Sequence, residues 1–422
     1  MISPRHLLLA SLAFVMCRVV EAAAPGVSGF DPERLGRVDA AIQREIDAHR
    51  LPGGVLLIAR DGKPAHLKTF GFQDIERQQP MPADAIFRIA SMSKAVTTVA
   101  ALMLYEEGRF MLNDPVSKYI PAFAHSVVAV PPPADAPPGT KYVTVPAVRP
   151  ITIRNLMTHT AGLTYGDGLA VDDYKKANVY YWYFANHDEP IGDAINRLAK
   201  LPLHAQPGEQ WQYGFSLDVL GYLVEVVSGM PLDRFIAERI TRPLKMPDTC
   251  FFLPPEKASR LATVYAAEKG ALVRGDQGDY VTGPRKCFSG GAGLLSTAND
   301  YGRFLQMLCN GGELDGVRLL SPTTVALMHT NQIGEKYAAT PHPPGENAHG
   351  FGLGFWVNDE PGFMGEAIGE GAYGWGSAYF PQYIVDPNQH LVMFFMTQLR
   401  PAGGSDLTHR LKVLTYQALT GE

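Results

Sequence analysis

The segments of this 422-residue chain that most resemble β-strands lie near its two ends, and the middle of the chain is mainly helical in pattern. Residues 53–60 and 64–70 are separated by Asp61-Gly62, a pair typical of a tight hairpin turn. The strand candidates near the other end are residues 350–357, 379–385 and 390–398. We therefore predict an α+β fold in which both chain ends complete one antiparallel sheet, flanked by helices, with a large mainly helical insert.

Apolar residues at helical spacing predict the helices that cover this sheet and fill the insert. They occupy residues 32–49, 191–200, 217–228, 232–239, 297–310 and 407–420. We predict one domain over residues 24–422, with its α/β part at about 30–90 and 285–422 and its helical part at about 91–284. A functional cleft is expected where the two parts meet. The Pro-rich stretch 130–150 is predicted to be a surface loop.

The first 23 residues have the three-part pattern of an export signal. Two basic residues precede an apolar run at residues 7–17, and small residues follow around Ala22. The run is too short to span a bilayer. We therefore predict a signal peptide over residues 1–23, a periplasmic or secreted protein and no stable membrane span. Lipid attachment at Cys17 is disfavoured because Phe14-Val15-Met16 are larger than the residues that usually precede a lipidated cysteine.

Composition excludes several kinds of partner. Charged residues make up 19% of the chain and its net charge of −5 is spread without long runs, so no basic stripe for nucleic acid is expected. The twelve His are dispersed, with no His-x-x-x-His pair, and neither a metal nor another cofactor is expected. Cys250, Cys287 and Cys309 are too few for a disulfide framework, although one bridge remains possible. The oligomeric state is left open.

The tetrapeptide Ser91-Met92-Ser93-Lys94 lies between a strand-like run, 85–90, and an apolar helix predicted from residue 95. On a helix, residues three apart share a face, so the side chains of Ser91 and Lys94 can meet. A serine hydroxyl becomes a good nucleophile when a neighbouring base takes its proton, and a partly desolvated Lys can be that base. The free N–H groups at the helix start would favour an anionic intermediate.

Two later segments offer partners for Ser91. Tyr213 immediately precedes an apolar helix, where a phenol can be held rigidly and can relay a proton. Residues Trp375 to Ala378 lie at the start of a predicted strand. If this strand passes Ser91, one of its backbone N–H groups can form an oxyanion hole together with the backbone N–H of Ser91. The aromatic run 180–184 either packs the helical part against itself or forms the wall of a substrate pocket.

Together these motifs resemble the penicillin-recognising serine hydrolases of the class C β-lactamase type, and among them the family VIII carboxylesterases. Besides residues 91–94, the matching segments are Leu156 to Leu163, Pro207-Gly208 with Trp211, Leu220-Gly221 and Gly290 to Leu294. The resemblance covers about residues 35–419. It implies that Ser91 is the nucleophile, Lys94 the activating base and Tyr213 the third catalytic residue. The backbone N–H groups of Ser91 and Ala378 would form the oxyanion hole, and His159 would be structural.

Two departures from the β-lactamase pattern bear on the substrate. Phe215 stands where those enzymes carry the Asn of Tyr-x-Asn, and Trp375-Gly376-Ser377 stands where they carry Lys-Thr-Gly. The lysine of those enzymes would attract the carboxylate of a β-lactam, whereas a tryptophan offers an apolar surface. The resemblance therefore implies substrate contacts at Phe215, Trp375, Gly376 and Ser377, and neutral esters as substrates.

The leading interpretation is an exported carboxylesterase that forms an acyl-enzyme on Ser91 from a small-molecule ester. The first alternative is β-lactamase or DD-peptidase activity on the same machinery. The second is a catalytically silent binding protein. An α/β-hydrolase with a nucleophile elbow is excluded, because no Gly-x-Ser-x-Gly pentapeptide occurs in the chain.

Overall fold

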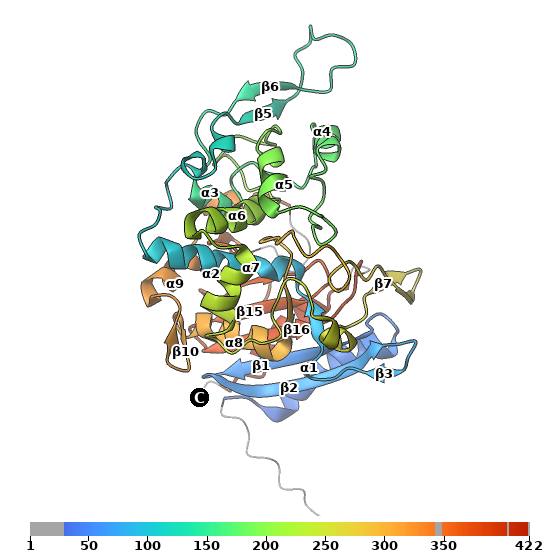
Figure 1. Cartoon of the computed structure of the whole chain (residues 1–422). Helices are drawn as coiled ribbons and strands as arrows, with labels where there is room; N and C mark the ends of the chain where they lie inside the picture. Colours follow the sequence, from blue (N-terminus) through green and yellow to red (C-terminus); the bar gives the residue numbers. More distant parts are fainter. Residues whose placement is uncertain (1–28, 342–347, 403–404, 421–422) are drawn as a thin grey trace, which may run out of the picture.

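The computed structural model describes residues 29–341, 348–402 and 405–420. Its main feature is an eight-stranded antiparallel sheet with the strand order β12-β13-β14-β15-β16-β1-β2-β3. Figure 1 labels β1, β2, β3, β15 and β16 of this sheet. The strands are β1 (Gly53–Arg60), β2 (Lys63–Asp74), β3 (Gln79–Pro80), β12 (Gly350–Phe351), β13 (Trp356–Val357), β14 (Tyr373–Gly376), β15 (Gln382–Asp386) and β16 (Leu391–Met396). Val55 of β1 faces Met396 of β16, so the two chain ends meet inside the sheet. The predicted α+β architecture is confirmed.

Helices cover both faces of this sheet, which explains why every residue of β16 is apolar and buried. Helix α8 (Ala298–Cys309) packs on the face that carries Phe394, and α10 (Leu407–Tyr416) packs on the opposite face with Met393 and Phe395. Alternating residues of a strand point to opposite faces. Helix α1 (Pro32–Asp47) lies against α10, and the Asp31 side chain caps it by accepting the Arg34 N–H.

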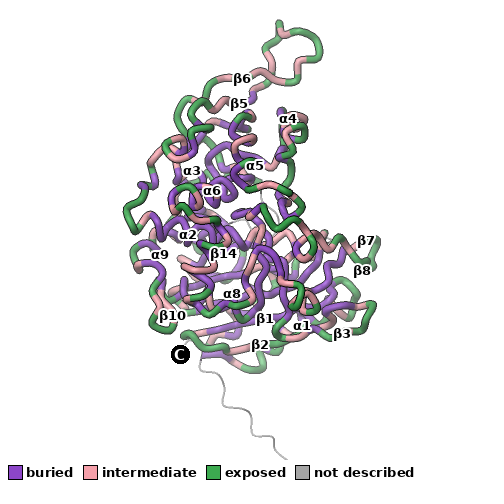
Figure 2. The backbone as a smooth tube through the Cα atoms, in the orientation of Figure 1, coloured by how far each residue is buried: buried purple, intermediate pink, exposed green. Residues whose placement is uncertain are grey.

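The helical part contains α3 (Ile153–Met157), α4 (Val171–Lys176), α5 (Ile191–Leu198), α6 (Ser216–Ser228) and α7 (Leu232–Ile236). Helix α2 (Ser93–Glu106) packs against α6. All residues of α2 from Ser93 to Leu104 are buried, and Figure 2 shows this continuous buried core. Helix α9 (Pro322–Met328) lies close to the far end of α2.

Three segments differ from the sequence predictions. The predicted strand 350–357 is the hairpin β12–β13, because Gly354 adopts a φ of +99° and turns the chain inside an apolar run. The predicted loop 130–150 contains β6 (Val143–Pro146), which pairs with β5 (Val127–Val130) in a projecting hairpin (Figure 1). The insert also holds the hairpin β7 (Tyr265–Glu268) and β8 (Ala271–Arg274), which helical patterns did not predict.

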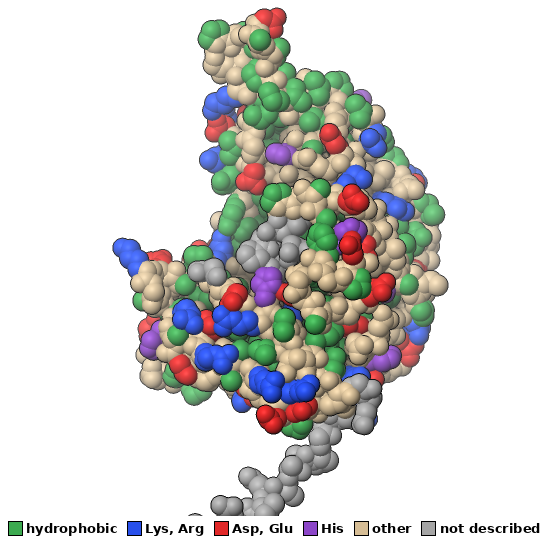
Figure 3. Space-filling model, turned by 180° about the vertical axis from the view of Figure 1, so that it is seen from behind, with side chains coloured by type: hydrophobic (Ala, Val, Ile, Leu, Met, Phe, Trp, Pro, Cys, Tyr) green, Lys and Arg blue, Asp and Glu red, His purple; other side chains and the backbone are tan. Residues whose placement is uncertain are grey.

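The predicted signal peptide, residues 1–23, lies outside the described residues. In the part of the chain that is described, no helix has the length and apolar character needed to cross a membrane. Cys250, Cys287 and Cys309 are free thiols, so no bridge joins them. Figure 3 shows acidic and basic side chains interspersed over one face of the molecule.

Candidate active site

Ser91 lies at a sharp junction between a strand and a helix. Strand β4 (Ile86–Arg88), paired with β9 (Leu295–Thr297), leads into a 3₁₀ turn over Ala90–Met92, and α2 follows directly. Ala90 has a φ of +37°, a left-handed conformation that non-glycine residues rarely adopt. The turn leaves Ser91 partly exposed while Lys94, one turn further on, is completely buried.

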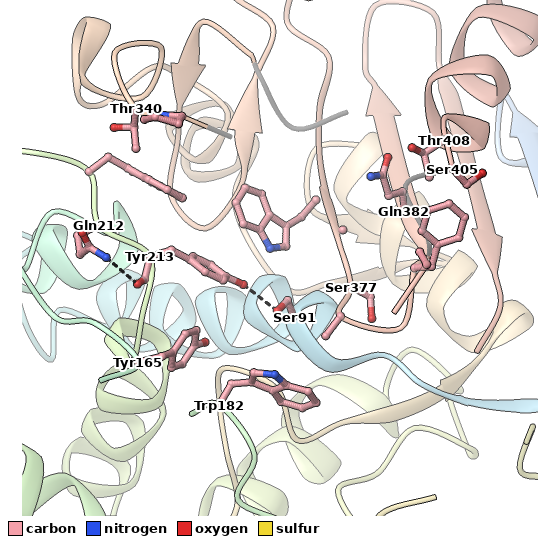
Figure 4. Close-up of a pocket in the computed structure, with 17 residues that line it drawn as sticks. Ser91, Tyr165, Trp182, Gln212, Tyr213, Thr340, Ser377, Gln382, Ser405 and Thr408 are labelled. Carbon is pink, nitrogen blue, oxygen red and sulfur yellow. Dashed lines mark hydrogen bonds between the residues drawn. The ribbon is translucent and has the colours of Figure 1, made fainter. Parts of the chain in front are cut away.

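The structure brings Ser91, Lys94 and Tyr213 together. The Tyr213 hydroxyl donates to Ser91 Oγ at 2.7 Å, and Figure 4 shows the phenol pointing at the serine. Lys94 Nζ lies 3.2 Å from the same Oγ and 4.7 Å from the centre of the Tyr213 ring. A cation in this place favours negative charge on the oxygens of Ser91 and Tyr213. The arrangement can therefore take the proton of the serine when Lys94 and Tyr213 together hold one proton fewer than an ammonium and a phenol.

Lys94 has two further acceptors that the sequence did not predict. Its Nζ donates to the carbonyl oxygen of Gly291 at 2.7 Å and to the Tyr165 hydroxyl at 3.3 Å. With Ser91 Oγ, these acceptors take up all three donor positions of an ammonium group. Burial raises the pKa of Tyr165 well above its usual value, so this phenol stays neutral. No sequence motif singled out Tyr165; the one signal that could have done so is its place two residues after the motif segment that ends at Leu163.

Asp218 is a second residue that sequence reasoning missed. It is fully buried on α6, and its Oδ1 accepts the Ser289 hydroxyl at 2.5 Å and the Gly291 N–H at 3.0 Å. Burial raises the pKa of Asp218, while hydrogen bonds and the attraction of Lys94 oppose that rise. A side chain on Gly291 would meet Asp218 at 2.5 Å. Asp218 thus fixes the turn whose carbonyl holds Lys94.

His159 is completely buried and packs against the Tyr213 ring, with 4.8 Å between ring centres. Neither ring nitrogen has a hydrogen-bond partner among the described residues. Burial, with a smaller contribution from Lys94, holds the pKa of His159 well below its usual value, so the ring is neutral. Its position agrees with a structural role in supporting Tyr213.

Ser91 opens onto a cavity of about 610 Å³ (Figure 4). The described residues that line it are Ser91, Tyr165, Trp182, Trp211, Gln212, Tyr213, Thr340, Pro341, Trp375, Gly376, Ser377, Ala378, Phe380, Gln382, Ala402, Ser405 and Thr408. None of these side chains carries a formal charge, and six are aromatic. Such a lining suits an uncharged, largely apolar ligand.

Ala378 and the predicted contacts Trp375, Gly376 and Ser377 all lie on this cavity. Strand β14 passes the turn that carries Ser91. It pairs with β13 only at Tyr373 and Gly374, so its last two residues extend beyond the end of β13. The Trp375 ring lies 5.6 Å from that of Tyr213. The short length of β13 thus leaves this end of β14 open to a ligand.

Phe215, which we predicted to contact substrate, is not among the cavity residues. Its side chain is fully buried, and its ring packs 4.8 Å from Tyr165 and 5.7 Å from Phe184. Phe215 immediately precedes α6, and its side chain points into the core rather than toward Ser91. Phe215 packs against Tyr165, which lines the cavity, and does not reach the cavity itself. The prediction that Phe215 contacts the substrate is therefore wrong.

The aromatic run 180–184 fulfils both expectations for it. Trp182 lines the cavity, whereas Phe184 packs inside the helical part against Phe215.

Over residues 29–341, 348–402 and 405–420, no group of three or more His, Cys, Asp or Glu side chains is arranged to hold a metal ion.

Comparison with known sequences places most of the chain in one family. The family model described as Beta-lactamase matches residues 38–417. Protein Rv1367c of Mycobacterium tuberculosis is 35% identical over 376 residues, covering 86% of this chain and 89% of the relative. Esterase EstB of Burkholderia gladioli is 30% identical over 404 residues, covering 90% and 94%.

Solved structures agree with this placement. EstCE1, a hydrolase with promiscuous acyltransferase activity, matches with a TM-score of 0.76 and 26% identity, covering 92% of this chain and 98% of its own. Simvastatin synthase (LovD) of Aspergillus terreus matches with a TM-score of 0.77 and 25% identity, covering 92% and 99%. The chain therefore belongs to the β-lactamase family of serine hydrolases, and its relatives there include esterases and acyltransferases.

Proposed function

We propose that this protein hydrolyses carboxylic esters through a covalent acyl-enzyme on Ser91, as a family VIII-type carboxylesterase. One observation carries the proposal. Ser91 Oγ lies within hydrogen-bond distance of both Lys94 Nζ and the Tyr213 hydroxyl, at the edge of a cavity whose described lining is uncharged. A nucleophile with two proton-transfer partners beside an uncharged pocket suits acyl transfer from a neutral ester.

To act as the base, the Lys94–Tyr213 pair holds one proton fewer than an ammonium and a phenol together. In the first half of the reaction, Ser91 Oγ bonds to the ester carbonyl carbon while its proton passes to that pair. The carbonyl electron pair moves onto oxygen, where the N–H groups of Ser91 and Ala378 stabilise the negative charge. The bond to the alcohol then breaks, and the pair returns its proton to the departing alcohol oxygen. The acyl group remains on Ser91.

In the second half, water attacks the acyl carbonyl and gives its proton to the same pair. The tetrahedral intermediate collapses, and Ser91 Oγ recovers a proton as the free acid leaves. An alcohol that takes the place of water would receive the acyl group instead. EstCE1 is a hydrolase with promiscuous acyltransferase activity, and such a transfer is compatible with a cavity of this size.

Neutral esters are favoured over β-lactams because the described residues that line the cavity include no cation to pair with a carboxylate. Trp375 occupies the place where β-lactamases carry a lysine, and Phe215 replaces their amide side chain and is buried. An anionic substrate would lose solvation without gaining a counter-charge.

We also propose the arrangement predicted from the sequence: a signal peptide at residues 1–23, then one hydrolase domain at residues 24–422. In that domain the α/β part is formed by about residues 30–90 and 285–422, and the helical part by about 91–284. Export to the periplasm or the medium follows from this proposal, and detection of the mature N-terminus by mass spectrometry would test it.

The proposed substrate preference is tested by comparing p-nitrophenyl butyrate with nitrocefin and benzylpenicillin on purified enzyme. We expect kcat/KM for the ester to exceed that for either β-lactam by about 100-fold or more, because a buried carboxylate without a partner is strongly disfavoured. Trp375→Lys is expected to narrow this gap by raising β-lactam turnover and weakening binding of apolar acyl groups. A β-lactam that proves the better substrate would make β-lactamase the function.

Replacing Asp218 with Asn is expected to lower kcat about 10- to 100-fold with little change in KM. Asparagine keeps an acceptor for the Gly291 N–H but removes the negative charge beside Lys94, and proton transfer depends on that lysine. Steady-state kinetics and a thermal unfolding curve measure the two effects separately. Asp300→Asn is the matched control, since Asp300 is an equally buried carboxylate that binds the Asp248 N–H on another part of the fold. An equal loss of kcat in both variants would refute a specific role for Asp218.

A further inference from the structure

The cavity extends from Ser91 in two directions (Figure 4). Tyr213 and Gln212 lie toward one end, beside Thr340. The opposite end is formed by Gln382, Ser405 and Thr408, which come from β15 and from the start of α10. A substrate whose carbonyl sits at Ser91 can therefore place one arm toward each end.

Two polar side chains at the second end have no hydrogen-bond partner among the described residues. The hydroxyl of Thr408 and the side-chain amide of Gln382 make no hydrogen bond with any residue in the described parts of the chain. Thr408 is only 5% exposed, and the small pocket that continues from it is lined by Tyr383, Met393, Phe395, Leu411 and the buried Lys412. Ser405 differs from them, because its hydroxyl already accepts the Leu407 N–H.

Neither the Thr408 hydroxyl nor the Gln382 amide is sealed off from the cavity, since neither belongs to the buried side-chain atoms that lack a partner. Both are therefore accessible to a polar group of a ligand. Gln382 offers two donors and an acceptor, and Thr408 offers one donor and an acceptor. Gln382 is held in place by its strand, since β15 pairs it with Gly376 on one side and Phe395 on the other. Two such groups, fixed and facing the same cavity, are suited to bind an oxygen atom of a ligand.

The position of Tyr213 indicates which arm of an ester reaches this end. The departing alcohol must receive its proton from the pair that includes Tyr213, so the alcohol lies on the Tyr213 side of Ser91. The acyl chain then runs the other way, past Ser377 and toward Gln382 (Figure 4). The described residues that line the cavity along this path carry no charge. Lys412, which lies with Gln382 and Thr408 on the adjoining small pocket, is paired with Glu366 at 3.2 Å, so it does not favour an ionised acyl group.

We propose that Gln382 and Thr408 form a subsite that binds an uncharged oxygen, a carbonyl or a hydroxyl, carried on the acyl chain of the substrate. The proposal rests on the proposed ester hydrolysis at Ser91 and specifies its substrate class. The preferred substrates are then esters of oxo- or hydroxy-acids, rather than esters of plain fatty acids.

The test uses p-nitrophenyl esters of oxoalkanoic acids with the ketone at successive positions along the chain. Each is compared with the ester in which a methyl branch replaces the ketone oxygen. We expect the wild-type enzyme to prefer at least one oxo ester over its isostere by about tenfold in kcat/KM. One or two hydrogen bonds to a neutral group account for a preference of this size. In Gln382→Met/Thr408→Val this ratio is expected to fall to about one.

The ratio is taken within each protein, so an overall loss of activity in the double variant does not affect it. Thr144→Val is the matched control, because Thr144 is exposed on β6 at a distance from the cavity and should leave the ratio unchanged. A wild type without any preference, or a preference that survives the double substitution, would overturn the subsite.

Failure of the proposed function is distinguishable from failure of the subsite. If no ester in the series is hydrolysed, ester hydrolysis is refuted. Calorimetric binding of each ester pair to Ser91→Ala then still measures the subsite, with about a tenfold difference in Kd expected for the best oxo ester. Equal Kd values for every pair would show that Gln382 and Thr408 do not recognise the acyl oxygen.

Discussion

Substituting Ser91 with Ala is expected to lower kcat/KM for a p-nitrophenyl ester by about 10³-fold or more, the usual consequence of removing the nucleophile of a serine hydrolase. The physical reason is that Lys94 and Tyr213 both converge on Ser91 Oγ, and no other serine hydroxyl among the described residues makes these two hydrogen bonds. The change removes one oxygen atom at a partly exposed position, so the fold should persist.

Ser93 provides the matched control for this substitution. It belongs to the same tetrapeptide, but its hydroxyl accepts the Leu294 N–H at 2.9 Å and is completely buried. Ser93→Ala should therefore change stability more than chemistry. A fluorophosphonate should label Ser91 alone, as read by peptide mass spectrometry. An adduct on Ser93, or full activity of Ser91→Ala, would refute the assignment of the nucleophile.

Lys94→Ala and Tyr213→Phe are each expected to lower kcat by about 10²- to 10⁴-fold, the range that positioned proton-transfer groups contribute. Both residues serve the same proton, so the double variant should be hardly slower than the worse single variant. A steady-state double-mutant cycle on one ester measures this coupling directly. Losses that multiply in the double variant would mean that the two residues act independently.

Tyr165→Phe is the control that separates contact with Lys94 from proton transfer. The Tyr165 hydroxyl accepts from Lys94 Nζ, as Ser91 does, yet Tyr213 is the tyrosine that bonds to Ser91 Oγ. We expect Tyr165→Phe to lower kcat by about tenfold or less, because it removes one of three acceptors that hold the lysine. A loss as large as that of Tyr213→Phe would assign Tyr165 to the proton-transfer group.

The sequence predicted those features that depend on local spacing. Ser91 and Lys94 are one turn apart, so their contact follows from helix geometry. The central strands follow from the Asp61-Gly62 turn and the apolar runs that flank it. Tyr213 was different, because no local pattern distinguishes it from other tyrosines and only the ordered family motifs pointed to it.

The remaining parts of the site depend on contacts between distant segments. Gly291 supplies a backbone carbonyl to Lys94. Every residue has a backbone carbonyl, so the residue type does not reveal which one binds the lysine. Asp218 is one of two acidic residues on the otherwise mainly apolar helix α6, and its importance follows only from the turn that packs over it. Phe215 was misplaced because sequence order gives the position of a residue but not the direction of its side chain. The β12–β13 turn was hidden in a continuous apolar run.

The pairing of β1 with β16 has a consequence for how the molecule is made. β1 is among the first segments to leave the ribosome, and β16 is among the last. Until β16 has been synthesised, the inner edge of β1 has unpaired N–H and C=O groups beside apolar side chains, which invites association with other chains. The central sheet must therefore form after translation, through contacts between segments far apart in sequence, which form slowly. A chain that stops before Leu391 would lack the strand that joins its two halves, and it would be a substrate for proteases rather than a smaller enzyme.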